Sequence, residues 1–349
     1  GRPGRECFCF TCYHRPVSSQ ELNLRVSIFM AYFDVFNGDA DGICALLQLR
    51  HHTPRIATLI TGVKRDIGLL SRVSASSGDV VTVLDVAVEK NRLDLDRLLQ
   101  LGAEIFYVDH HNPGEMPSAA GLQLLINTAP EICTSALVNG HLSGACASWA
   151  VVGCFGDNLD QTAERVAQTL PALPNLKLWR ELGILINYNA YGAHVSDLHF
   201  DPESLYRRLL PHASPDICLA EDPELMQILQ AGYRQDMSFG ETANRLINEA
   251  SVAVIRLPDE PWARRVSGVL GNKLALDTPY RAHAVLTEIP EGFLVSVRAP
   301  LDNRIGADTV CRQFPSGGGR AAAAGINQLP KENLSTFIDV LKKQYALSL

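Results

Sequence analysis

The stretch that decides the fold is Glu104-Ile-Phe-Tyr-Val-Asp-His-His111, an apolar run that ends in an acid and two histidines. A short run of β-branched and aromatic residues is typical of a buried strand. Two further runs of this kind also end in acids. Tyr32-Phe-Asp-Val-Phe36 is followed by Asn37-Gly-Asp-Ala-Asp-Gly42, and Val80-Val-Thr-Val-Leu84 is followed by Asp85.

Helix-length segments separate these runs, which predicts a parallel sheet with crossover helices. Such sheets bind ligands beyond the carboxyl ends of their strands, so we expect the three acidic clusters to converge. Their carboxylates would repel one another without cations, and carboxylates mixed with imidazoles suit Mn²⁺ or Mg²⁺. The pattern therefore predicts a two-metal site. The competing interpretation, a capped turn after a buried strand, requires three strand-end clusters to coincide by accident.

These residues also carry a family resemblance. Asp39-Ala-Asp-Gly42, the lone Asp85 and Asp109-His-His111 resemble motifs I, II and III of the DHH phosphoesterases, a family that includes RecJ-like exonucleases and oligoribonucleases. Gly317-Gly-Gly-Arg-Ala-Ala-Ala-Ala-Gly325 resembles the glycine-rich signature of the DHHA1 domain, which accompanies DHH in one large subfamily. The resemblance implies an α/β fold: a parallel-sheet DHH domain, a helical connector and a smaller α/β DHHA1 domain.

The expected organisation follows from that order. At 349 residues the chain is long enough for two cores, because single cores stop growing near roughly 250 to 300 residues. We expect a DHH metal-binding domain over 30–200, a helical connector over 201–250 and a DHHA1 substrate-binding domain over 251–349. Residues 1–29 show no periodicity, and we expect an extra segment that is disordered or lies outside the native start.

The resemblance also implies residue roles. Two Mn²⁺ ions, or Mg²⁺ in their place, would be bound by Asn37, Asp39, Asp41, Asp85, His110 and Asn187, with Asp85 bridging the pair. Asp109 and His111 would be catalytic, with His111 contacting the scissile phosphate. Substrate would be bound by Arg298, Gly317, Gly318, Gly319 and Arg320.

The sequence departs from the family pattern in three places. Asn37 stands where motif I usually has His or Asp, and Arg320 stands where the DHHA1 signature usually has His. Motif IV usually supplies an Asp, whereas this chain offers Asn187 or Asn189. Asp197 supplies the missing carboxylate if the chain folds back to the site, and otherwise lies in a surface loop. Both alternatives remain open at the level of sequence.

The second domain supplies a different chemistry. Gly317 to Gly319 can bring backbone N–H groups close to a phosphate, with Ala321 opening a helix behind them. A flexible turn is the plainer interpretation of three glycines. Arg298 ends the strand-like run Leu294-Val-Ser-Val297 and resembles the family's substrate-contacting arginine.

Composition narrows the function. A net charge of −7 argues against a broad basic surface for long duplex DNA, so small or short phosphorylated ligands fit better. No apolar run reaches the roughly 20 residues of a membrane helix, so we expect no membrane partner. Scattered cysteines without a secretion signal suggest reduced thiols and a cytoplasmic location.

Two classes of function remain. The first is a metal-dependent phosphoesterase that hydrolyses phosphodiester bonds in nucleotides, dinucleotides or short single-stranded oligonucleotides held between two lobes. The second is a catalytically weak or inactive nucleotide-binding regulatory protein of the same fold. The retained motifs I to III favour the enzyme, and the substitutions at motif IV and in the DHHA1 signature favour the regulator.

Overall fold

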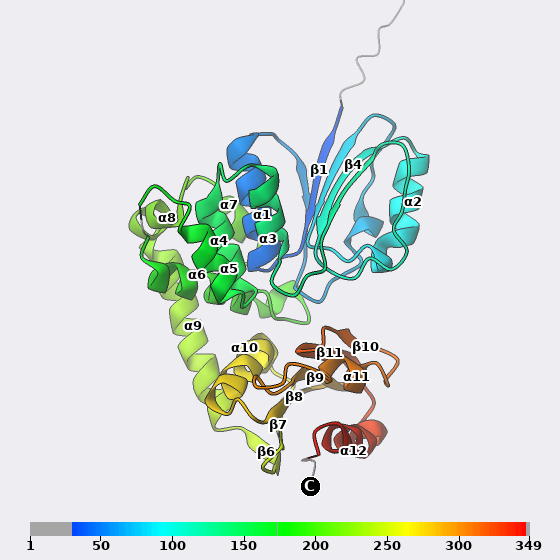
Figure 1. The fold of residues 1–349 in the computed structure, drawn as a ribbon, viewed down its shortest axis with the longest axis vertical. Coiled ribbons are helices and arrows are strands. Elements are labelled where there is room, and N and C mark those ends of the chain that lie inside the picture. The colour runs from blue at the N-terminus through cyan, green and yellow to red at the C-terminus, as the bar shows by residue number, and fades with distance from the viewer. Residues whose placement is uncertain (1–29, 173, 347–349) are drawn as a thin grey trace, which may run out of the picture. The chain divides into compact units, whose positions relative to one another are not determined.

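The computed structural model describes residues 30–172 and 174–346. Within these residues the strands form a five-stranded sheet and a six-stranded sheet (Figure 1). The expectation for residues 1–29 lies outside the described residues.

The first sheet is parallel throughout, with the strand order β2-β1-β3-β4-β5. Its strands are β1 (Tyr32–Phe36), β2 (Thr58–Ile60), β3 (Val80–Leu84), β4 (Glu104–Asp109) and β5 (Leu122–Ile126). Side chains of the three central strands are buried on both faces of the sheet, which explains their nearly continuous apolar sequences. The parallel sheet predicted from the sequence is confirmed.

Helices cover both faces of this sheet (Figure 1). Phe36, Leu84 and Val108 pack on one face with a group of helices, whereas Val35, Val83 and Tyr107 face α2 (Arg92–Gln100) on the other. The group comprises α1 (Ala40–His52), α3 (Thr134–His141), α4 (Ala147–Gly156), α5 (Asp160–Ala167) and α6 (Leu176–Asn189). Asp39 caps α1 by accepting a 3.1 Å hydrogen bond from Gly42 N, so the helix begins in motif I.

The next three helices along the chain follow α6 directly. They are α7 (Pro202–Leu209), α8 (Pro215–Glu221) and α9 (Pro223–Glu241). Each begins with a proline behind a capping side chain, which is a helix-start signal visible in the sequence. The expected connector over 201–250 is helical only in part, because residues 244–248 form strand β6 of the second sheet. Antiparallel pairing of these residues with β7 outweighs the helical propensity of the segment.

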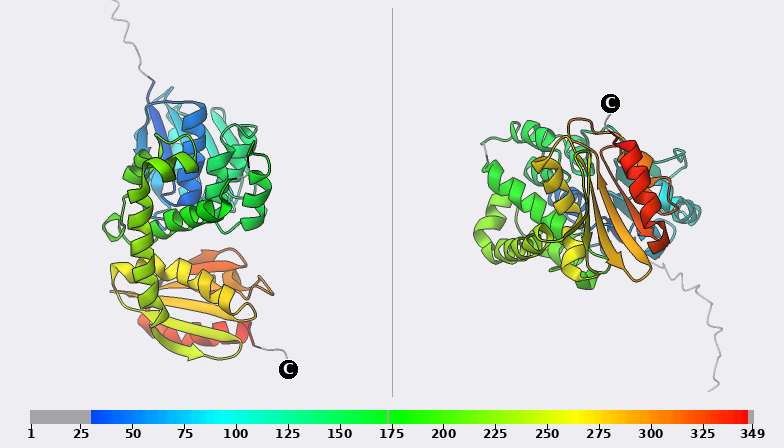
Figure 2. Two further views of the ribbon diagram at one scale, coloured as in Figure 1. Left: turned by 90° about the vertical axis from the view of Figure 1, so that its left-hand side faces the viewer. Right: turned by 90° about the horizontal axis from the view of Figure 1, so that it is seen from below.

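The second sheet is mixed, in the order β10-β11-β9-β8-β7-β6. Its strands are β6 (Asn244–Asn248), β7 (Val252–Leu257), β8 (Ala282–Ile289), β9 (Gly292–Arg298), β10 (Gly317–Gly319) and β11 (Ala323–Leu329). The helix α10 (Pro261–Asp277) joins the parallel pair β7 and β8. Figure 2 shows α10 on one face of this sheet and α12 (Leu334–Gln344) on the other. The short α11 (Ala307–Cys311) precedes β10.

The glycine-rich signature folds differently from the expectation. Ala321 does not open a helix. Instead β10 and β11 form a hairpin in which Gly318 pairs with Gly325, and β11 pairs in turn with β9. Only glycine fits at position 317, because a Cβ there would lie 1.7 Å from the carbonyl oxygen of Cys311. Its N–H group donates to Phe314 O, so this part of the expected anion cradle already has a partner.

Across the described residues, no helix combines the length and apolar character that a membrane crossing demands.

Candidate metal centre

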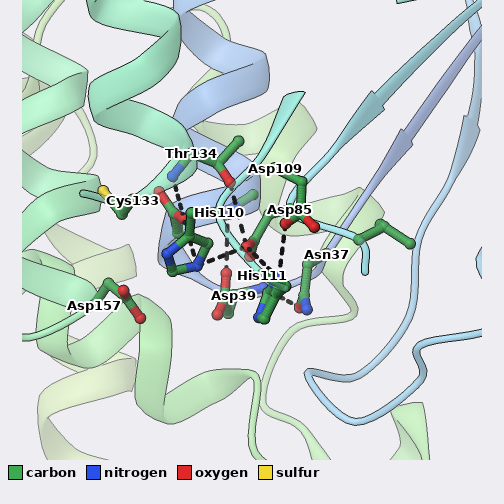
Figure 3. Close-up of polar contacts among 12 residues, drawn as sticks. Asn37, Asp39, Asp85, Asp109, His110, His111, Cys133, Thr134 and Asp157 are labelled. Atoms are coloured by element: carbon green, nitrogen blue, oxygen red, sulfur yellow. Dashed lines mark hydrogen bonds and ion pairs between the residues drawn. The ribbon is translucent and has the colours of Figure 1, made fainter. Parts of the chain in front are cut away.

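Three neighbouring strand ends bring the predicted acids together. Because β1, β3 and β4 are adjacent and parallel, their carboxyl ends lie at the same edge of the sheet. Figure 3 shows Asp39, Asp85 and Asp109 gathered there with His110 and His111. The three aspartates are 2%, 2% and 0% exposed. Carboxylates so far removed from water need compensating charge.

His110 is oriented as a metal-binding histidine would be. Its Nδ1 lies 2.9 Å from the carbonyl oxygen of Ile132, which fixes Nδ1 as the protonated nitrogen of the neutral ring. The other nitrogen, Nε2, faces carboxylates, at 3.4 Å from Asp85 Oδ1 and 3.8 Å from Asp41 Oδ2. A backbone acceptor on the far nitrogen is the usual support of a metal ligand.

Asp41 is held by the first turn of α3. Its two carboxylate oxygens accept hydrogen bonds from Thr134 N at 2.8 Å and Ser135 N at 2.6 Å. Burial nevertheless raises the pKa of Asp41, and His110 offsets only part of that effect. The carboxylate is thus fixed in position at a helix N-terminus and still favours additional positive charge.

Asp85 is the most crowded of these acids. Burial, followed by the charges of Asp39 and Asp41, raises its pKa well above the usual range for a carboxyl group. Its backbone is left-handed, with φ of 58°, a conformation uncommon outside glycine. Thr134 Oγ1 donates a weak hydrogen bond to it at 3.4 Å. An unusual backbone conformation together with unbalanced charge is typical of functional positions.

The donor set fits a divalent cation. Among the described residues, the ligand atoms of Asp85, His110 and His111 all lie within 4.8 Å of one another. A buried carboxylate oxygen of Asp109, Oδ2, has no hydrogen-bond partner in the described part of the chain. Oxygen and imidazole donors together suit Mn²⁺ or Mg²⁺, and a cation there would relieve the repulsion that burdens Asp85.

His111 is positioned by Asp109 and is less buried than its neighbour. Its Nδ1 lies 2.7 Å from Asp109 Oδ1, and the side chain is 42% exposed. Burial acts to lower the pKa of His111, but the hydrogen bond and charge of Asp109 outweigh it, so the pKa is raised. The pair can therefore present a protonated imidazole at the open side of the site.

Lys64 also belongs to this cluster, and the sequence analysis missed it. Its ammonium pairs with Asp39 and donates to Asn187 Oδ1 at 3.1 Å. Burial acts to raise the pKa of Asp39, but Lys64 outweighs burial and lowers it. A usable signal existed, since Lys64 comes after β2, whose carboxyl end lies at the same edge as those of β1, β3 and β4.

The two asparagines at the departures from motifs I and IV bond to Lys64. Asn37 Nδ2 donates to Lys64 O at 3.3 Å, and Asn187 accepts from its ammonium. Asn189, the other candidate for motif IV, serves the backbone instead. Its Oδ1 accepts from His199 N and Phe200 N at 3.1 Å each, and its Nδ2 donates to Phe200 O.

Asp157, after α4, is a second residue that the sequence analysis missed. Arg320 Nη2 lies 3.4 Å from Asp157 Oδ2, which joins the glycine-rich hairpin to the first domain. Burial acts to raise the pKa of Asp157, but Arg320, His110 and Lys64 together lower it. Arg320 remains 47% exposed, so part of its guanidinium is free to contact a ligand.

Two further arginines lack acidic partners within the described residues. Arg298 donates from Nε to Asn272 Oδ1 at 2.6 Å and from Nη2 to Gly268 O at 3.2 Å. Arg65 donates to Ser296 Oγ and Asn327 Oδ1, both at 3.2 Å. Burial, with a contribution from Arg298, lowers the pKa of Arg65 to about 10. Burial, with a contribution from Arg320, likewise lowers the pKa of Arg298. Guanidinium groups whose charge is disfavoured by burial and by a neighbouring guanidinium would be stabilised by a bound anion.

Asp197 follows the surface-loop alternative only in part. Its carboxylate binds Arg264 of α10 through two contacts of 2.8 Å, and Oδ2 also accepts from Ala193 N. Residues 193–196 are exposed, as the surface-loop alternative expects, but the side chain of Asp197 itself is buried. Both oxygens are engaged by the arginine, so Asp197 does not replace the motif IV carboxylate.

The fold has counterparts among known proteins. No protein-family model and no curated protein matches the sequence. A structure of the exonuclease RecJ bound to manganese matches with 18% identity and a TM-score of 0.54, over 91% of this chain and 91% of that one. The fold is that of RecJ. The resemblance to the DHH phosphoesterases is thereby confirmed at the level of the fold.

Two further structures share the RecJ fold of this chain. An exopolyphosphatase-related protein from Bacteroides fragilis has 13% identity and a TM-score of 0.51, over 91% of this chain and 93% of that one. The pGpG-specific phosphodiesterase PggH from Vibrio cholerae has 15% identity and a TM-score of 0.50, over 90% and 98%. The match extends across both sheets, so the predicted α/β architecture is confirmed.

Proposed function

We propose that this protein is a divalent-metal-dependent phosphoesterase that hydrolyses phosphodiester bonds in nucleotides, dinucleotides or short single-stranded oligonucleotides. The observation that carries the proposal is the arrangement around Asp85. A carboxylate whose charge is disfavoured by burial and by two neighbouring acids faces the Nε2 of a histidine held by a backbone carbonyl. That combination would stabilise a bound cation.

Asp41, Asp85 and His110 would hold Mn²⁺ or Mg²⁺, and Asp39, Asn37 and Asn187 complete the ligand set implied by the resemblance. When bound, the ion supplies Lewis acidity toward a phosphoryl oxygen. The catalytic work of the protein falls to Asp109 and His111. Asp109 holds His111 through Nδ1, which leaves Nε2 to donate a hydrogen bond to a phosphate oxygen. As water adds to phosphorus and the P–O bond breaks, Nε2 would give its proton to the leaving oxygen, and the proton lost by the water would restore the imidazolium.

Substrate binding is assigned to the arginines. In the described part of the chain Arg65 and Arg298 have no acidic partner, and Arg320 pairs only with Asp157. The phosphates of an oligonucleotide would therefore neutralise the charge of these guanidinium groups. Gly317, Gly318 and Gly319 would border the same ligand. A net charge of −7 favours a short substrate over long duplex DNA. The shared fold with RecJ and with a pGpG-specific phosphodiesterase agrees with this choice.

One observation favours a second candidate, a nucleotide-binding protein with weak or no activity. Lys64 places an ammonium on Asp39, and the residues at 37 and 187 carry no charge. Both features reduce the site's demand for metal. A protein of this kind would bind nucleotides through its arginines without turnover.

The deciding experiment is Mn²⁺-dependent turnover of pGpG and short single-stranded oligonucleotides by the wild type and by Asp85→Asn. Asparagine keeps the shape of the side chain and tolerates the left-handed backbone at position 85, which alanine does not. Removing a residue that merely supports a ligand costs about 10- to 100-fold in affinity or activity, so loss of a ligand should exceed about 100-fold.

Asp94→Asn is the matched control. This substitution also removes one carboxylate, but it lies on α2 in a half-exposed pair with Arg97. It should leave turnover unchanged. Near-normal turnover in Asp85→Asn would refute the enzyme assignment at this site. Nucleotide binding without turnover in the wild type would establish the second candidate.

A further inference from the structure

Four separate contacts fix Lys64 at the edge of the first sheet. Its ammonium pairs with Asp39 and donates to Asn187 Oδ1. Its backbone N–H donates to Ala190 O at 2.9 Å, and its carbonyl oxygen accepts from Asn37 Nδ2 at 3.3 Å. The residue is therefore held at its backbone and at its charged end, by α6 and by the loop after β1.

The amide at position 37 contributes something a carboxylate could not. Asn37 Oδ1 accepts from Asp39 N at 3.3 Å, and Nδ2 donates to Lys64 O. Aspartate could not make both bonds, because it has no donor and its charge would face the carbonyl. Asn187 likewise offers its ammonium partner a neutral oxygen. The two uncharged residues and the lysine thus form one connected group.

We propose that the ammonium of Lys64 occupies the place of one of the two cations expected at this edge, so that the site takes a single divalent ion at Asp41, Asp85 and His110. This inference rests on the proposed function, since it concerns the number of ions that the same site uses. It assigns Asp39 to the lysine and leaves Asn37 and Asn187 as residues that position Lys64.

The charges agree with this assignment. A second divalent ion at Asp39 would lie against the ammonium that now contacts both Asp39 and Asn187, and like charges this close repel strongly. To admit the ion, the ammonium would have to leave two acceptors while the lysine backbone stayed fixed. Within the described residues the Lys64 ammonium forms no ion pair or hydrogen bond with Asp41, Asp85 or His110, so an ion at those three residues would not have to displace it.

The fixed cation also has a use in the proposed reaction. An ammonium can stabilise charge on a phosphoryl group as a point charge, and unlike a metal ion it cannot be lost by dilution or chelation. A site built in this way needs one bound ion for activity and keeps one positive charge in the apo protein.

The test counts bound ions and does not depend on turnover. Purified protein is titrated with Mn²⁺ by calorimetry, and the bound Mn²⁺ is counted by elemental analysis and by electron paramagnetic resonance, which separates isolated ions from magnetically coupled pairs. The proteins are the wild type, the double variant Lys64→Met with Asn187→Asp, and the control Lys90→Met at an exposed lysine.

We expect one isolated Mn²⁺ ion per chain in the wild type and in Lys90→Met, and a coupled pair in the double variant. Two ions in the wild type would overturn this inference and leave the phosphoesterase proposal standing. No bound Mn²⁺ in the wild type would refute the metal-dependent function itself. A single ion in a folded double variant would show that Lys64 does not exclude the second ion. The wild-type count decides the matter even if the double variant fails to fold.

Discussion

Two groups of buried aspartates in this protein have opposite electrostatic character. At α10, each acid has its own guanidinium: Arg264 Nη2 lies 2.8 Å from Asp197, and Arg265 Nε lies 2.7 Å from Asp236. At the strand ends, Asp41, Asp85 and Asp109 have no lysine or arginine within ion-pair distance in the described part of the chain.

This difference distinguishes acids that stabilise the fold from acids that favour a bound ligand. A carboxylate paired with a guanidinium is complete, in the sense that its charge is balanced without any ligand. Such a pair joins helices, and removing the carboxylate lowers the stability of the protein. A carboxylate crowded by other carboxylates is incomplete, because its charge has no balancing partner. It lowers the stability of the apo protein and is stabilised by a bound cation. The same residue type, equally buried, therefore predicts opposite responses to substitution.

The largest effect is expected at the complete pair. Asp236→Asn leaves Arg265 buried without its counter-ion and weakens the bond from the Tyr188 hydroxyl to the same carboxylate. Breaking a buried pair from one side costs about 3 to 5 kcal/mol. Urea unfolding of the wild type and the variant in a chelating buffer measures the loss, with Asp94→Asn, in a half-exposed pair, as the control. A loss below about 1 kcal/mol would erase the distinction between the two regions.

The next effect concerns the incomplete site. Saturation with Mn²⁺ should stabilise the wild type, by about 2.7 kcal/mol when the free ion reaches 100 times its Kd. Asp85→Asn should lose most of this gain. In chelator the same variant should be at least as stable as the wild type, because it removes a charge that the fold disfavours. Thermal melts with and without Mn²⁺ give both numbers, and a destabilised apo variant would contradict the argument.

The sequence was sufficient for the sheet and for most of the site, because both obey one rule. The carboxyl ends of parallel strands lie at a common edge, so the positions of Asp85 and Asp109 could be predicted from apolar runs alone. Lys64 was missed because the rule was applied only to strands that end in acids. The short strand β2 ends four residues before Lys64, and no acid follows it directly.

Partners that lie far along the chain could not be predicted. Asp197 and Arg264 are 67 residues apart, and nothing near either residue indicates that α10 packs against the turn at 195–197. The hairpin at Gly317 has a similar cause. Alanines at 321–324 favour a helix locally, and only pairing with β9 makes the second half of that segment a strand. Tertiary context decided both cases.

The smallest effect tests Asp197 and its pH dependence. Asp197→Asn should cost about 1 to 2 kcal/mol, less than Asp236→Asn, because Arg264 retains its contact with Asp259.

Burial acts to raise the pKa of Asp197, but the hydrogen bonds from Arg264, Ala193 and His194 lower it to about 2, against 3.8 for a free carboxyl. A lowered folded-state pKa means that the charged carboxylate stabilises the fold. Its contribution is therefore complete above pH about 3.8 and is lost as the pH falls through about 2. The difference in unfolding free energy between wild type and variant should be constant from pH 5 to 7 and shrink only below about pH 4, as measured by urea titrations across that range. A difference that already shrinks between pH 7 and 5 would mean that the pair at α10 is not complete, and the contrast with the strand-end site would fail.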